Sequence, residues 1–283
     1  TGPALATCPS RSTRGDLVMY TLEDTRPNRI VERLLGEHHS LPLSIALHLV
    51  PGVLIVAAYL LIAQPIVETI GYPAFMGWAI ALCLVLIPLL AGLAWLGRLH
   101  NGRFSLRGVL HYTDRPVPRG KLVAMVAALI AWMMVAGLTL APLNNVCKGF
   151  FGWLPYANTG DSGNNTYLDM HGYSHSMLLT TMVICLPLTG ISLPLIEELY
   201  FRGFLLPRIA YLRGRAPVVN TVLFALYHFW SPWVFVSRVI FTFPGYWFAW
   251  RYKDIRLSIG MHVGVTSIVA TLGTAAFALD LIR

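Results

Sequence analysis

Long apolar runs alternate with short polar loops along most of this chain. A helix needs about 20 mainly apolar residues to cross the hydrocarbon core of a bilayer, and most of the runs reach that length. The pattern therefore predicts an all-α, polytopic membrane helix bundle with about seven transmembrane helices, six and eight being the alternatives. The predicted spans are residues 43–66, 73–97, 121–143, 176–209, 217–230, 233–250 and 257–281.

Two parts of the chain depart from a simple row of straight spans. The fourth run is too long for one straight helix, and we expect Pro187 and Pro194 to kink it because proline lacks an N–H and clashes one turn back. Residues 1–40 are polar and form the predicted cytoplasmic N-terminal segment, with an interface-lying or solvated helix within 11–39. The predicted membrane domain then covers residues 41–283.

Composition supports a membrane protein. The 283 residues are 56% hydrophobic and only 12% charged, whereas soluble domains have about 25% charged residues. The formal net charge of +8 does not indicate a nucleic-acid partner, because the basic residues sit in short loops between apolar runs. The four cysteines lack the spacing of a zinc ribbon or a disulfide framework. The partner expected from composition is the lipid bilayer.

Lysine and arginine are concentrated in every second loop, which predicts the orientation in the membrane. Loop 67–72 has neither residue, and loop 144–175 has only Lys148. The N-terminus and residues 200–215 are therefore predicted to be cytoplasmic, and the C-terminus to lie on the far side. The basic loops hold Arg11, Arg14, Arg26, Arg29, Arg33, Arg98, Arg103, Arg107, Arg115, Arg119, Lys121, Arg208, Arg213, Arg215, Arg251, Lys253 and Arg256.

The stretch LPLIEELYFRGFLLPR, residues 193–208, places three charges in an apolar run. A charge in the middle of a bilayer costs roughly 2.5–3.5 kcal/mol on insertion scales, so these need a reason. Arg202 is four residues after Glu198, so the two share a helix face and can pair. Glu197 is then the less neutralised carboxylate, which suits a general base. The alternative is a structural ion pair, with Glu197 reaching the cytoplasmic interface.

Two histidines in other late spans extend this candidate site. His228 lies in the fifth span, with Phe224 one turn before it, and His262 lies in the seventh, with Thr266 one turn after it. Ionisable residues inside a membrane usually face the bundle interior and each other. The combination predicts one polar site that holds a water molecule. By contrast, His48, His171 and His175 are expected to be packing residues.

Two chemistries fit these residues. Glu197 and His228 can activate water directly, while His262 and Thr266 stabilise an oxyanion. Alternatively, Glu197, His228 and His262 bind a divalent metal such as zinc, which lowers the pKa of its bound water. The H-E-x-x-H helix of common zinc peptidases is absent from the sequence. The residues leave the choice between no cofactor and a metal open, and peptide hydrolysis suits both.

These motifs resemble the CPBP family, the CAAX prenyl proteases and bacteriocin-processing enzymes also called Abi proteins. The resemblance covers about residues 176–270, and rests on EELYFR at 197–202, FALYH at 224–228 and the segment that ends at His262. It implies an intramembrane endopeptidase with a cavity open toward the cytoplasm. By resemblance, Glu197 is the base assisted by Glu198, His228 helps to hold the water, and His262 helps to form the oxyanion hole.

One departure from the family pattern affects the expected activity. The third motif usually ends in Asn, whereas this chain has Thr266, which has one hydroxyl donor on a shorter side chain. The leading hypothesis is an endopeptidase acting on a peptide or protein tail at the membrane. The alternative is a catalytically inactive member that acts as a scaffold or regulatory partner in a membrane complex. A transporter is the third hypothesis, but the chain shows no repeated half.

Overall fold

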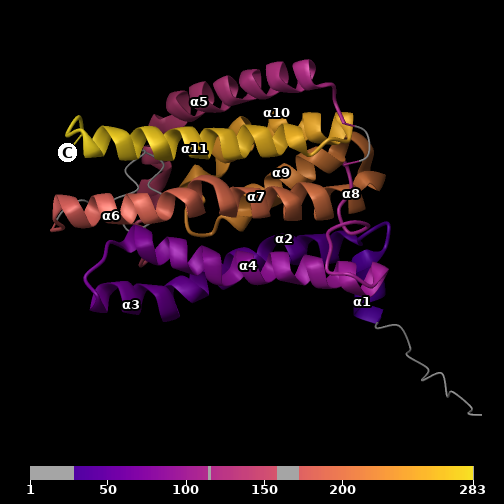
Figure 1. Ribbon diagram of the computed structural model, residues 1–283, viewed down its shortest axis with the longest axis horizontal. Coiled ribbons are helices and arrows are strands. Elements are labelled where there is room, and N and C mark those ends of the chain that lie inside the picture. The colour runs from indigo at the N-terminus through magenta and orange to yellow at the C-terminus, as the bar shows by residue number, and fades with distance from the viewer. Residues whose placement is uncertain (1–28, 114–115, 158–171, 283) are drawn as a thin grey trace, which may run out of the picture.

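The computed structural model describes residues 29–113, 116–157 and 172–282, which fold into a helical bundle without strands in these ranges (Figure 1). Five of the described helices are long and apolar enough to cross a bilayer, counting helices that continue through wide turns as one. The prediction of an all-α membrane bundle is thus confirmed, while the count of seven spans stays a prediction. The five are Leu41–Thr69, Ala74–Asn101, Arg119–Phe150, His175–Arg208 and Arg256–Ala278.

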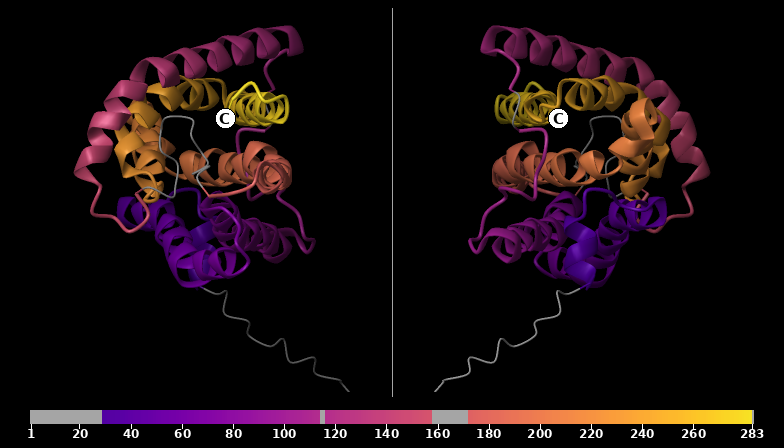
Figure 2. Two further views of the ribbon diagram at one scale, coloured as in Figure 1. Left: turned by 90° about the vertical axis from the view of Figure 1, so that its left-hand side faces the viewer. Right: turned by 90° about the vertical axis from the view of Figure 1, so that its right-hand side faces the viewer.

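The helices form layers that are visible in Figures 1 and 2. In Figure 1, α5 lies outermost above α10 and α11, the chain from α6 to α9 lies in the middle, and the N-terminal helices lie beneath. Of the predicted N-terminal segment, the structure describes residues 29–40, which include α1. The elements are α1 (Arg29–Leu35), α2 (Leu41–Ala58), α3 (Gln64–Thr69), α4 (Ala74–Asn101), α5 (Arg119–Phe150), α6 (His175–Cys185), α7 (Leu193–Glu198), α8 (Leu206–Arg208), α9 (Ala216–Tyr227), α10 (Phe235–Tyr252) and α11 (Arg256–Ala278).

The helix that carries the glutamate pair stays continuous through two π-helical segments, η2 (Leu186–Ser192) and η3 (Leu199–Leu205). Pro187 lies in η2 and Pro194 at the start of α7, so the wide turns occur where the sequence predicts kinks. A π-helical turn re-aims side chains without ending the helix, and such turns occur often at functional sites. Here they enclose α7, the segment that contains both glutamates.

The predicted fifth span is shorter than expected. Helix α9 has 12 residues, which corresponds to about 18 Å at 1.5 Å per residue. The hydrocarbon core is about 30 Å thick, so α9 ends inside it. Backbone that is not helical is tolerated at membrane depth only where protein covers it or where it lines a cavity. His228 follows α9 immediately with non-helical dihedral angles (φ −78°, ψ 59°).

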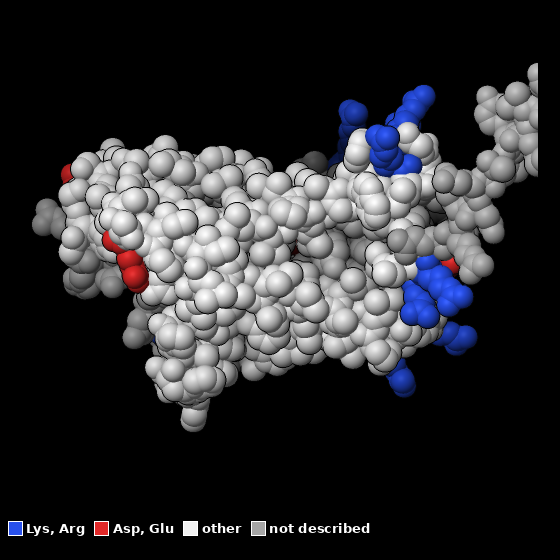
Figure 3. Space-filling view, turned by 90° about the horizontal axis from the view of Figure 1, so that it is seen from below, with Lys and Arg blue, Asp and Glu red and all other residues white. Residues whose placement is uncertain are grey.

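Basic side chains gather at one end of the bundle, which we call the basic end (Figure 3). Here α4 and α10 end, and α5 and α11 begin. A set of hydrogen bonds, the basic-end latch, joins the segment before α5 to the turn before α11. Ile255 N donates to Tyr112 O (3.1 Å), Val117 N to Asp254 Oδ2 (2.8 Å) and Arg256 Nη2 to Val117 O (2.8 Å).

Candidate active site

The ion pair expected from the four-residue spacing is present on α7 and η3. Arg202 Nη1 lies 3.2 Å from Glu198 Oε1, and both side chains are fully buried. The guanidinium carbon also lies 3.1 Å from the ring centre of Tyr246 and 3.9 Å from that of Phe224. Aromatic faces attract cations, so these rings help to hold the arginine where it neutralises Glu198. Glu198 is therefore fixed and ionised.

His262 connects this pair to the second glutamate. Its Nδ1 lies 2.8 Å from Glu198 Oε1, and its Nε2 lies 3.9 Å from Glu197 Oε2. Because Glu198 is ionised, Nδ1 carries the proton and donates to it. The longer distance exceeds a direct hydrogen bond and suits a contact through one water molecule. The histidine thus orients one face of its ring toward Glu197.

Glu197 is 6% exposed and is held by a residue that the sequence analysis missed. The hydroxyl of Tyr227 donates to Glu197 Oε1 over 3.0 Å. Tyr227 immediately precedes His228 in the FALYH motif. A phenol in an apolar helix was the available signal, because a buried tyrosine hydroxyl usually has a polar partner.

The end of α9 sets the orientation of His228. Its Nδ1 lies 2.8 Å from the carbonyl oxygen of Phe224, which can only accept, so Nδ1 carries the proton. In the neutral ring, Nε2 is then left as an acceptor. The ring is 8% exposed and packs edge-on against Phe224 and Tyr227, with centroids 4.7 and 4.8 Å apart.

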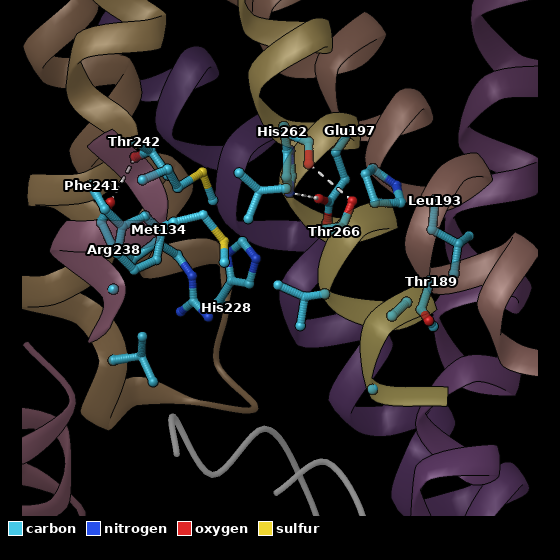
Figure 4. Close-up of a pocket in the computed structure, with 18 of the residues that line it drawn as sticks. Met134, Thr189, Leu193, Glu197, His228, Arg238, Phe241, Thr242, His262 and Thr266 are labelled. Carbon is cyan, nitrogen blue, oxygen red and sulfur yellow. Dashed lines mark hydrogen bonds and ion pairs between the residues drawn. The ribbon is translucent and has the colours of Figure 1, made fainter. Parts of the chain in front are cut away.

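A cavity of about 770 Å³ brings four predicted site residues together. Its wall includes Glu197, His228, His262 and Thr266, contributed by three separate parts of the chain (Figure 4). Glu198 and Arg202 are completely buried beside this wall. The geometry thus divides the six predicted residues into four that line a shared cavity and two that support it.

Thr266 lines the cavity, but its hydroxyl already has backbone partners. Oγ1 donates toward Gly190 O at 2.7 Å and also lies 2.9 Å from His262 O. A threonine hydroxyl has a single hydrogen to donate. An oxyanion would therefore have to displace these carbonyls, so the contact with η2 favours a structural role for Thr266 over the oxyanion role considered from the sequence.

Arg238 of α10 is a second residue that the sequence analysis missed. It lines the same cavity, is 6% exposed, and donates from Nη2 to Ser231 Oγ over 3.1 Å. Figure 4 shows it on the same side of the cavity as His228, and its charge interacts electrostatically with that ring. An arginine within the predicted sixth span was the signal, since charges inside a membrane are costly. The cavity therefore contains a positive charge opposite Glu197.

A buried hydrogen-bond chain supports the glutamate helix from behind. His48 Nδ1 donates to Ser44 O (2.7 Å), and the amide of Asn220 donates to both His48 Nε2 (2.9 Å) and Phe201 O (3.0 Å). The expectation that His48 is a packing residue agrees with this arrangement. Among the other histidines, His175 lies within 3.1 Å of Phe277 O, and His171 lies outside the described residues.

The side chains do not present a preformed metal site. Across the described ranges, no three His, Cys, Asp or Glu side chains are grouped so that they can hold one ion. The Nδ1 atoms of His228 and His262 are occupied by Phe224 O and Glu198. The predicted set of Glu197, His228 and His262 thus shares a cavity without forming a ligand cluster in this arrangement, and the chemistry below uses protein groups alone.

Fold and cavity together define a class: an integral membrane protein with a buried carboxylate–histidine site. Comparison with known proteins narrows the class. The family described as Type II CAAX prenyl endopeptidase Rce1-like matches residues 179–268, the segment that carries all three motifs. The match confirms the predicted resemblance to the CPBP family and indicates a CAAX-type intramembrane protease. No curated protein and no solved structure matches the chain.

Proposed function

We propose that this protein is an intramembrane endopeptidase that hydrolyses a peptide bond in a membrane-associated peptide or protein tail. One observation carries the proposal: Glu197, His228 and His262 line one cavity, with the Glu198–Arg202 pair buried beside them. A carboxylate, two histidines and a fixed counter-charge around one space are the parts that water activation requires.

In the proposed first step, water lies between Glu197 and the imidazoles. Glu197 accepts a proton while the water oxygen bonds to the scissile carbonyl carbon. Nε2 of His228 is an acceptor, so it can hold the second hydrogen of the same water. His262 keeps its orientation through its hydrogen bond to Glu198. Removal of this proton is worth about 10²–10⁴-fold in rate for a positioned base.

The second step breaks the bond to the leaving nitrogen. The negative charge that forms on the carbonyl oxygen is stabilised by the positive charge of Arg238 beside His228. When the carbon–nitrogen bond breaks, the proton on Glu197 passes to the nitrogen, which leaves as an amine. The other product is a carboxylic acid, and Glu197 returns to its starting state.

A catalytically inactive scaffold is the second candidate, and Thr266 favours it. The family pattern has a donor-rich Asn at this position, whereas the hydroxyl of Thr266 is engaged by Gly190 O. A scaffold needs the buried ion pair and its aromatic packing, but it does not need Glu197 to exchange protons. Substitution at Glu197 therefore separates the two functions.

The test uses the full chain in lipid vesicles, with a prenylated peptide ending in a CAAX tail and the same peptide without the prenyl group as probes. We expect the wild type to cleave at least one probe. Glu197→Gln should lower kcat by about 10²–10⁴-fold, because an amide cannot accept the proton. His228→Ala should lower it as well. Liquid chromatography with mass spectrometry identifies the cleaved bond.

Glu68→Gln is the matched control, since Glu68 is an exposed glutamate on α3. It should cleave at the wild-type rate. Thermal unfolding of each purified variant shows whether a loss of cleavage reflects a loss of fold. Cleavage at the wild-type rate in folded Glu197→Gln would refute the assigned base, and a folded wild type that cleaves neither probe would favour the scaffold.

A further inference from the structure

The cavity is a wedge between α5 and α11, and its two ends differ. Both helices start at the basic end and run in the same direction (Figure 1). Near that start they touch: a Cβ on Gly260 would lie 2.7 Å from Val126 Cγ2, and one on Gly264 would lie 2.6 Å from Ile130 Cδ1. Side chains of α5 thus sit directly on the backbone of α11.

Farther along, the same two helices separate. A Cβ on Gly273 of α11 or on Gly137 of α5 would have no described atom within 4 Å beyond its own surroundings in the helix. Gly273 is nine residues beyond Gly264, which is about 14 Å along the axis. Both glycines line the cavity. The space between α5 and α11 is therefore closed at the basic end and widens toward the opposite end.

Other contacts close the remaining routes from the basic end. The basic-end latch ties the turn before α11 to the segment before α5 through Asp254, Val117 and Arg256. On its other side, α11 is joined to η2, where Thr266 and Ser267 both donate to Gly190 O. The cavity wall instead continues past Gly273 to Thr274 and Ile282, near the C-terminal end of α11.

We propose that the cavity is entered from the end opposite the basic loops, through the wedge between α5 and α11. This inference rests on the proposed function for the identity of its ligand, a peptide segment with apolar side chains. Methionines 133 and 134, Leu138, Val269 and Leu272 make the wedge apolar, and Glu197 lies at its inner end. Such a segment would lie along the wedge and bring a peptide bond to the carboxylate.

This direction reverses one expectation from the sequence. The distribution of Lys and Arg predicts that the basic end is cytoplasmic, and the resemblance to the CPBP family implies a cytoplasmic mouth. With the basic end in the cytoplasm, the wedge admits substrate from the other side of the membrane. Substrates would then be tails exposed at that face, or in the leaflet next to it.

Cysteine accessibility tests the route without any need for activity. In a background with all four native cysteines replaced by alanine, Gly273→Cys and Gly137→Cys put thiols on the two walls of the wedge. Gly120→Cys at the start of α5 and Gly149→Cys near its end mark the two faces, and added atoms at these glycines meet no described neighbour within 4 Å. Full-length protein is placed in vesicles with one preferred orientation, and a membrane-impermeant sulfonated maleimide is added outside.

We expect the labelled fractions of Gly273→Cys and Gly137→Cys to match that of Gly149→Cys. Labelling that follows Gly120→Cys would overturn the proposal, and so would labelling only by a membrane-permeant maleimide. Two wedge variants guard against a local folding defect in one. Because the readout is a thiol adduct measured by mass spectrometry, inactivity in the cleavage assay leaves this result unchanged, so failure of the route and failure of the function are distinguishable.

Discussion

Two acid–arginine pairs in this protein use the same chemistry in opposite surroundings. Glu198 and Arg202 lie four residues apart within one helix, fully buried, with the guanidinium between aromatic rings. Asp254 and Arg256 lie at the basic end, where the arginine side chain is 42% exposed. The Asp254 carboxylate accepts from the backbone N–H groups of Val117 and Arg256 as well as from the guanidinium.

The difference shows which pair serves the fold alone. Asp254 fastens two segments, and its partners satisfy it where the chain meets the membrane surface. A buried pair has a desolvation cost that its attraction often only balances, so it is weak evidence for stability. Glu198 also contacts His262, which faces the cavity. We infer that the inner pair is maintained for the site, while the outer pair locks the basic end.

The largest expected effect is on the inner pair. Arg202→Met leaves Glu198 buried without its counter-charge, which should lower the free energy of unfolding by about 3–5 kcal/mol. The double variant Glu198→Gln with Arg202→Met removes both charges and should recover most of that loss. Denaturant-induced unfolding of the full chain in detergent micelles measures both.

Arg256→Met is the matched control, since it removes an arginine from a partly exposed pair. It should cost about 0–1 kcal/mol for the ion pair itself. If Arg202→Met and Arg256→Met cost the same, or if the double variant is no more stable than Arg202→Met, the contrast between the inner and outer pairs is wrong.

A smaller effect, with a defined pH dependence, is expected at Asp254. Burial raises the pKa of this carboxyl, but hydrogen bonds from Arg256 and from the backbone outweigh it, so the folded-state pKa lies below its ordinary value. Its stabilisation is therefore complete above the unfolded-state pKa of about 3.9 and is lost as pH falls through the folded-state pKa. Asp254→Asn should cost about 1–3 kcal/mol at pH 7.

The difference between wild type and Asp254→Asn should shrink when thermal unfolding is repeated at pH values from 6 down to 3. Asp280→Asn is the control, because Asp280 is an exposed acid whose contact is His175 at 3.5 Å. It should change stability by about 0–1 kcal/mol at pH 7. A difference for Asp254→Asn that stays constant down to pH 3 would contradict a role for the charged form.

Periodicity and spacing predicted the class of fold and the inner ion pair, because both depend on local rules. Twenty-residue apolar runs require membrane helices, and a four-residue spacing puts Glu198 and Arg202 on one face. The early end of α9 was not predicted, since no Gly or Pro marks the chain at Tyr227. That end depends on tertiary contacts, as does the position of His228 beside the cavity.

The partners that complete the site were also beyond sequence patterns. Tyr227 and Arg238 contact or face the site through the packing of α9 and α10 against the glutamate helix. Asn220 supports it through a carbonyl, a backbone atom that no motif records. The direction of the wedge follows from where α5 leaves α11, and this angle is set by small residues that are far apart in the sequence.

The smallest expected effect concerns Thr266, which belongs to the inner region but is bonded like the outer one. Thr266→Val keeps the shape and removes the hydrogen bond to Gly190 O, which should cost about 0.5–1.5 kcal/mol. Ser267 also donates to this carbonyl, so the lower value is expected. Thr266→Ser keeps the hydroxyl and is the matched control. Because Gly190 O engages the hydroxyl, kcat for probe cleavage should be unchanged in both variants. A kcat that falls tenfold or more in Thr266→Val, with Thr266→Ser unaffected, would show instead that the hydroxyl leaves the carbonyl to serve the reaction.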